Sequence, residues 1–146
     1  MILRSARSTD AGKTGAILSE FIDTTSWMPR IHTRAEDIGF CGKMIEAGEV
    51  TVAEVDHAVA GFLTLHQGEV HCLYVSGSKQ GQGIGKALLD HAKNGASRLE
   101  LWTFQANDGA RRFYKREGFA EVEMTDGSGN DEQLPDVRLV WERTTQ

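Results

Sequence analysis

A glycine-rich stretch in the middle of the chain constrains the fold more than any other feature of the sequence. The run VSGSKQGQGIGKALLDHAK, residues 75–93, places Gly81, Gly83 and Gly85 within five positions and then continues in residues that favour helix. Glycine inside a helix costs about 1 kcal/mol relative to alanine. Three glycines at the start of a helix therefore indicate that the function of this segment depends on its backbone rather than on side chains.

This stretch follows a predicted strand and opens a predicted helix, which is the setting of an anion site. The first N–H groups of a helix have no partner within the helix, and the helix dipole adds partial positive charge at that end. Lys79 and Lys86 flank the loop and could add charge. The pattern predicts a phosphate-binding loop, and an ordinary turn with a helix cap is the alternative.

Two common phosphate motifs do not fit the stretch. The Rossmann fingerprint G-x-G-x-x-G needs its third glycine later than GQGIG supplies it, and it belongs to the first strand–helix turn of a chain. The Walker motif G-x-x-x-x-G-K-[ST] is not present here. Neither a dinucleotide-binding fold nor a P-loop enzyme is therefore expected.

Hydrophobic periodicity and turn residues divide the rest of the chain into alternating elements. A second helix over about 33–47 should carry Ile38, Cys41 and Ile45 on one stripe. The expected order is β-α-α-β-β-β-α-β-α-β-β. It predicts an α/β (α+β) fold in which a central, mixed but mostly antiparallel sheet of about seven strands is flanked by about four helices. The strands are expected at about 1–6, 49–55, 58–66, 69–75, 98–104, 119–125 and 136–142. The other helices are expected from about 8–10 until the segment TTSWMPR, from the glycine-rich segment to about 94, and at about 108–117.

Length, charge and composition limit what the protein can be. The 146 residues are predicted to form a single domain, 1–146. A formal net charge of -5 argues against nucleic acid as a partner. No apolar run approaches the length of a membrane span, and no His or Cys spacing suggests a metal site. Because its two cysteines are far apart and the sequence shows no signal peptide, the protein is expected to be cytoplasmic.

The glycine-rich stretch resembles motif A of the GNAT acetyltransferase superfamily, [R/Q]-x-x-G-x-[G/A], here residues 80–85, QGQGIG. Downstream, LELWTFQANDGARRFYKREGF resembles motif B, with Asn107, Ala110, Phe113, Tyr114 and a Gly-Phe pair in place. One departure is Ser76-Gly77-Ser78, where many members carry proline. The resemblance implies a single-domain GNAT fold and transfer of an acetyl group from acetyl-CoA to a primary amine of a small molecule or peptide, by direct attack in a ternary complex.

The resemblance also implies roles for individual residues. Tyr114 would be the general acid for the leaving thiolate, because a phenol stays protonated at neutral pH. Backbone N–H groups near Leu73 to Val75 would stabilise the oxyanion, and Asn107 would hold the pantetheine arm or cap the next helix. The predicted acetyl-CoA contacts are Leu73, Tyr74, Val75, Gln80, Gly81, Gln82, Gly83, Ile84, Gly85, Lys86, Asn107 and Phe113.

The general base is left open between two residues. The two-residue period of a strand puts Glu69, His71, Leu73 and Val75 on one face. Glu69 matches the base position of the histone-acetylating branch of the family, and His71 titrates near neutrality. A solvated glutamate, a structural histidine and a water chain without a dedicated base are the alternatives.

The acceptor side varies most within the family that the chain resembles. Trp27, Met28 and His32, in the segment TTSWMPRIHT, and Trp102 are predicted to line the acceptor pocket. Core packing is the alternative for the two tryptophans and Met28. The last strand could pair across a homodimer. A non-catalytic acyl-CoA-binding sensor on the same fold is the alternative function, and Tyr114 favours the enzyme.

Overall fold

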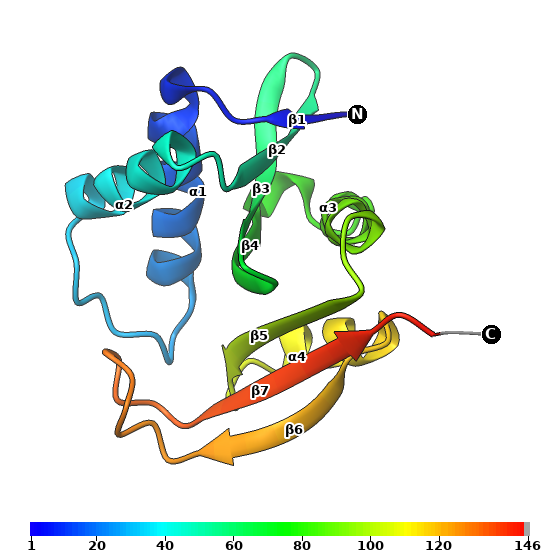
Figure 1. Cartoon of the computed structure of the whole chain (residues 1–146). Coiled ribbons are helices and arrows are strands. Elements are labelled where there is room, and N and C mark those ends of the chain that lie inside the picture. The colour runs from blue at the N-terminus through cyan, green and yellow to red at the C-terminus, as the bar shows by residue number, and fades with distance from the viewer. Residues whose placement is uncertain (145–146) are drawn as a thin grey trace.

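The chain folds into three layers, with one seven-stranded sheet between two pairs of helices (Figure 1). The structure is a computed structural model, and it describes residues 1–144. Its elements are β1 (Ile2–Ser5), α1 (Ala11–Thr24), α2 (Arg34–Glu46), β2 (Val50–Val55), β3 (Ala58–His66), β4 (Glu69–Val75), α3 (Ile84–Asn94), β5 (Arg98–Phe104), α4 (Asp108–Arg116), β6 (Ala120–Thr125) and β7 (Asp136–Glu142), with 3₁₀ turns at Ser8–Asp10 and Gly77–Lys79. The predicted fold class and element order are confirmed.

The strand order is β1-β2-β3-β4-β5-β7-β6, and every neighbouring pair is antiparallel except β4 and β5. Helices α1 and α2 cover one face of the sheet, and α3 and α4 cover the other (Figure 1). Each face has its own buried core, and each fully buried aliphatic side chain stabilises the fold by about 1.5–3 kcal/mol. The α3/α4 core includes Leu88, Leu89, Leu99, Leu101 and Leu139, and the α1/α2 core includes Ile17, Cys41, Val52, Phe62 and Cys72.

The sheet opens between its two halves at the parallel junction. Strand β4 pairs with β5 at Glu69–Glu100 and Val70–Leu101 within the described residues. Both strands continue well beyond these two pairs, to Val75 and Phe104. Beyond Val70, therefore, the β4 backbone that faces β5 lacks a strand partner among the described residues, and a gap runs through the middle of the sheet.

A bulge in β4 changes which residues share a face. The register with β3 shifts between Thr64 and Leu65, so His71 is an extra residue between Val70 and Cys72. As a result Val70, Leu73 and Val75 contact the α3/α4 core, whereas Cys72 and Tyr74 contact the α1/α2 core. The predicted common face of Glu69, His71, Leu73 and Val75 is therefore wrong beyond the bulge.

The contact between α1 and α2 corrects a second expectation. Cys41 and Ile45 are buried as predicted, but Ile38 is 40% exposed. Ile38 instead packs against Gly15 of α1, where an added Cβ would lie 2.6 Å from Ile38 Cγ1. The two helices therefore approach closely at a glycine, and Ile38 covers the edge of that contact rather than the core.

None of the helices within residues 1–144 has the length and apolar character that crossing a membrane requires.

Candidate active site

The glycine-rich loop presents the open N-terminus of α3. Gly81 and Gly83 have positive φ angles of 77° and 81°, a region that L side chains rarely adopt. Gly83 is the N-cap of α3, and no side chain within the described residues caps the first turn. A Cβ added to either glycine would meet nothing within 4 Å, so the space above the loop is open. The loop has the geometry of an anion site at a helix N-terminus.

A large cavity extends from this loop. Its volume is about 610 Å³, and its walls come from the C-terminal part of α1, the end of β4, the glycine-rich loop and α4. Such a volume falls within the range of small-molecule and cofactor sites. Among the residues predicted to contact acetyl-CoA, Leu73, Tyr74, Val75, Gln80, Gly81, Gly85, Asn107 and Phe113 line it.

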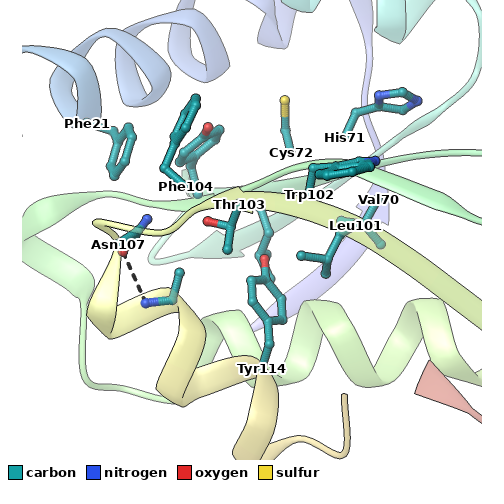
Figure 2. Close-up of a pocket in the computed structure, with 13 residues that line it drawn as sticks. Phe21, Val70, His71, Cys72, Leu101, Trp102, Thr103, Phe104, Asn107 and Tyr114 are labelled. Carbon is teal, nitrogen blue, oxygen red and sulfur yellow. Dashed lines mark hydrogen bonds between the residues drawn. The ribbon is translucent and has the colours of Figure 1, made fainter. Parts of the chain in front are cut away.

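A second, narrow cavity of about 90 Å³ occupies the gap between β4 and β5 (Figure 2). Its walls include Cys72, Leu101 and Thr103, from the two strands that separate there. The two cavities share six lining residues, Phe21, Leu73, Tyr74, Asn107, Ala110 and Tyr114. The gap in the sheet therefore adjoins the cavity of the glycine-rich loop.

Tyr114 lies where these two cavities meet. Figure 2 shows its side chain rising from α4 toward the β5 residues Leu101 and Thr103. Its ring is 5.2 Å from that of Phe113 and 5.5 Å from that of Phe119, measured between centroids, and the residue is 8% exposed. Burial raises the pKa of the Tyr114 hydroxyl far above its usual value. The phenol is thus protonated throughout the physiological range.

Asn107 lines both cavities and caps α4. Its Oδ1 accepts a 3.1 Å hydrogen bond from the Ala110 N–H, drawn as the dashed line in Figure 2. The capping alternative for Asn107 is confirmed, and a contact with the pantetheine arm stays a prediction.

The two candidate bases lie next to each other at the start of β4. His71 Nδ1 is 3.5 Å from Glu69 Oε2, and the two side chains are 42% and 35% exposed. His71 lines the narrow cavity, whereas Glu69 is not among the lining residues. The His66 ring lies 6.2 Å from that of His71 and pairs with Glu49. His71 is thus the candidate base that faces the gap, with Glu69 and His66 beside it.

The predicted acceptor residues divide into two groups. Trp102 lines the narrow cavity and is 39% exposed. Trp27 is half-buried, and its ring lies between those of Phe21 and Phe104. Met28 and His32 line neither cavity: Met28 is half-buried in the α1–α2 loop. His32 is exposed at the start of α2, 3.9 Å from Glu36.

Several residues of the predicted cofactor set have other contacts. Lys86 Nζ forms ion pairs with Glu117 at 3.0 Å and Asp90 at 3.2 Å, so its charge is partly compensated. Ile84 is buried in the α3/α4 core. Gln82 is exposed in the loop and lines neither cavity.

Several residues that line these cavities were not singled out from the sequence, among them Glu20, Phe21 and Phe104. Phe21 falls within the first helix expected from the sequence, and Phe104 ends the strand expected at about 98–104. These residues come together only because α1 lies near the ends of β4 and β5. No local sequence pattern therefore identifies them as lining residues. No group of three His, Cys, Asp or Glu side chains in residues 1–144 is placed to hold a metal ion.

Comparison with known sequences gives consistent matches. The sequence model of the acetyltransferase (GNAT) domain matches residues 46–121. The chain is 26% identical over 140 residues to the peptidyl-lysine N-acetyltransferase YjaB of Salmonella typhimurium, covering 95% of this chain and 97% of that protein. It is 42% identical over 64 residues to an uncharacterized N-acetyltransferase of Methanocaldococcus jannaschii. That match covers 40% of this chain and only 28% of the archaeal protein.

Solved structures share the fold over nearly the whole chain. The apo form of YjaB from Escherichia coli has a TM-score of 0.79 at 22% identity, over 97% of this chain and 98% of that chain. The yncA protein of Salmonella typhimurium, solved with its cofactor acetyl-CoA, has a TM-score of 0.76 at 18% identity, over 100% of this chain and 95% of that chain. The domain match over residues 46–121 covers just over half of the sequence and includes both the glycine-rich loop and Tyr114. The chain belongs to the GNAT family of acetyltransferases.

Proposed function

We propose that the protein transfers the acetyl group of acetyl-CoA to a primary amine of a small molecule or peptide, within a ternary complex. The observation that carries the proposal is the position of Tyr114, which lines both the cavity of the glycine-rich loop and the gap in the sheet. The relative YjaB of Salmonella typhimurium, named a peptidyl-lysine N-acetyltransferase, favours a lysine side chain as the acceptor.

The larger cavity fits acetyl-CoA in charge and shape. The free N–H groups at the start of α3 and the open space above Gly81 and Gly83 suit a pyrophosphate. Lys79 forms no ion pair within the described residues and adds positive charge beside the loop. The half-buried Phe113 and the ends of β4 and α4 offer apolar and polar contacts to a pantetheine arm, with Asn107 among them.

Acetyl-CoA, when bound, supplies an acetyl thioester as the electrophile. The neutral amine forms the new carbon–nitrogen bond as the carbon–sulfur bond breaks, and the departing sulfur needs a proton. Tyr114 is placed to donate that proton, because burial keeps its pKa high and its hydroxyl protonated. Backbone N–H groups of β4 beyond Val70 have no partner on the β5 side and suit the oxyanion.

The amine proton must leave on the opposite side. His71 borders the gap, and its Nδ1 lies 3.5 Å from Glu69 Oε2, so we assign this pair as the proton acceptors, working through water. After transfer, Tyr114 regains its proton as the amine proton reaches solvent, and the charges balance over one turnover.

The experiment is a calorimetric titration with acetyl-CoA, with NAD and ATP in parallel, followed by a CoA-thiol release assay with a lysine-containing peptide. We expect micromolar binding of acetyl-CoA alone and thiol release that depends on the amine. Binding of acetyl-CoA without transfer to any amine would instead support a non-catalytic sensor. Absence of acetyl-CoA binding would exclude both functions.

A further inference from the structure

A row of aromatic rings crosses the gap between β4 and β5 on the side of α1. The ring centroids of Phe104 and Trp27 are 5.7 Å apart, those of Trp27 and Phe21 6.4 Å, and those of Phe21 and Tyr74 5.0 Å. Phe21, Tyr74 and Phe104 also line the narrow cavity. We call these four residues the aromatic row. It joins the two separated strands on the face opposite α3 and α4.

Tyr74 contributes a polar group to this row. Its ring is held between Phe21 and Phe62, with the Phe62 centroid 5.9 Å away. Its hydroxyl forms no hydrogen bond within residues 1–144, although the residue is half-buried. Burial raises the pKa of this hydroxyl well above its usual value, and Cys72, Tyr114 and Glu132 add to the effect. A protonated phenol with no internal partner is thus held in place at the gap.

We propose that the aromatic row is the acceptor subsite, that the Tyr74 hydroxyl hydrogen-bonds the attacking nitrogen, and that the acceptor is a primary amine at the end of an unbranched alkyl chain. The inference rests on the proposed function and adds the class of acceptor. It also gives Tyr74 a different role from the cofactor contact that the sequence predicts. Tyr114 approaches the reacting atoms from α4, and Tyr74 approaches them from the other face.

The lining of the gap suits an amine that must lose its proton. Its titratable side chains are His71, Cys72, Tyr74 and Tyr114, and neither Asp nor Glu is among the lining residues. An ammonium group that enters exchanges water for rings and phenols, and this desolvation favours the neutral, nucleophilic amine. In this proposal the rings pack against the carbon chain, and the Trp27 ring can attract the cation.

The size of the gap selects the shape of the acceptor. A volume of about 90 Å³ between two strands admits a slender chain. We expect so narrow a gap to exclude a substituent on the carbon that bears the nitrogen. The α-amine of a peptide is branched at that carbon, whereas the side chain of lysine carries four methylene groups before its nitrogen.

The test compares two amine probes in the CoA-thiol release assay, Nα-acetyl-lysine amide and alanine amide. We expect wild-type kcat/KM to be at least 100-fold higher for the lysine probe. Tyr74→Phe should raise the KM for that probe about 5- to 10-fold, as expected for one lost hydrogen bond. Its Kd for acetyl-CoA, measured by calorimetry, should stay within twofold of wild type.

Tyr114→Phe is the matched control, since it removes the other hydroxyl that faces the gap. It should lower kcat and leave the KM for the lysine probe unchanged. An unchanged KM in Tyr74→Phe, or equal use of the alanine probe, would overturn the inference while leaving the proposed function intact. No transfer to either probe by wild-type protein that binds acetyl-CoA would overturn both.

Discussion

The Glu20 carboxylate accepts a 2.7 Å hydrogen bond from the backbone N–H of Gly77, 57 positions further along the chain. Glu20 lies in the last turns of α1, and Gly77 begins the 3₁₀ turn that precedes the glycine-rich loop. The bond ties the C-terminal part of α1 to the segment that leads into the glycine-rich loop. Glu20 also lines the larger cavity and is the acidic residue among its walls.

Substituting Glu20 separates these two roles. Glu20→Gln keeps an oxygen that accepts from Gly77 and removes a negative charge from a cavity proposed to hold a polyanion. We expect it to bind acetyl-CoA at least as tightly as wild type. Glu20→Ala loses the anchor and should bind about 3- to 10-fold more weakly than Glu20→Gln. Calorimetry on the two variants measures the difference, and equal affinities would show that the bond does not position the loop.

Tyr114→Phe should reduce kcat about 100-fold or more, because proton donation typically contributes that much. The Kd for acetyl-CoA should not change, since the ring and its packing are retained. Because burial raises the pKa of Tyr114, deprotonation of this residue should not reduce wild-type kcat up to about pH 10. Steady-state kinetics from pH 6 to 10 measure both effects, and wild-type turnover in the phenylalanine variant would remove Tyr114 from the acid role.

Gly83→Val should weaken acetyl-CoA binding at least tenfold. The φ angle of Gly83 is 81°, which a β-branched residue adopts only with strain, and its side chain would enter the open space above the loop. Gly95→Ala at the other end of α3 is the matched control, because Gly95 has a φ of -99° and open space around it. If both variants bind alike, the glycine-rich loop does not hold the cofactor.

Glu69→Gln and His71→Asn should each lower kcat about tenfold, since the two side chains act together on one proton. The double variant should then lose little more than the more affected single variant, because residues that act as a unit are not additive. A multiplicative loss in the double variant would show independent roles. Unchanged kcat in all three would assign proton removal to water alone.

The pH dependence of stability should depend in part on Asp10. Its carboxylate accepts bonds from Arg4 Nη1 at 2.8 Å, Arg4 Nη2 at 3.1 Å and the Arg7 N–H at 2.7 Å. The Arg4 bond, above all, lowers the pKa of Asp10 below its usual value. A carboxyl whose pKa falls on folding stabilises the protein above its unfolded pKa, and this contribution is lost as the pH falls through the folded one.

Asp10→Asn should therefore reduce the free energy of unfolding by about 1–3 kcal/mol at pH 7 and flatten its decline below about pH 4. Urea denaturation from pH 7 to 3 measures both. Asp131→Asn is the control, because Asp131 is exposed in the β6–β7 loop. A parallel decline of stability in Asp10→Asn and wild type would exclude this contribution.

The sequence predicted the order of elements because each carries a local signal. The Thr33–Glu36 capping box starts α2, and the positive φ of Gly83 precedes α3. Tyr114 was found from a local motif too. These features depend on residues within one or two helical turns of each other, which is the range over which propensity and capping act.

The sequence did not predict features that depend on contacts between distant residues. Nothing in EVHCLYV marks the bulge at His71, because the stretch holds neither glycine nor proline, and the shift arises from its pairing with β3. The separation of β4 from β5 depends on two strands 23 or more residues apart, so the gap could be inferred only from resemblance.

The two residue pairs that join β4 to β5 have a thermodynamic consequence for the whole chain. Within each half of the sheet, neighbouring strands are joined by backbone hydrogen bonds. The two halves meet at the β4–β5 junction, the seam, where side-chain packing provides most of the contact. A ligand bound in that seam would add contacts between the two halves of the sheet, where backbone pairing is short. Such a ligand would bind the folded chain and not the unfolded one. Its concentration then sets the melting temperature. Saturating ligand at 100 times its Kd would add about 2.7 kcal/mol to the free energy of unfolding, so the fold is most stable while the site is occupied.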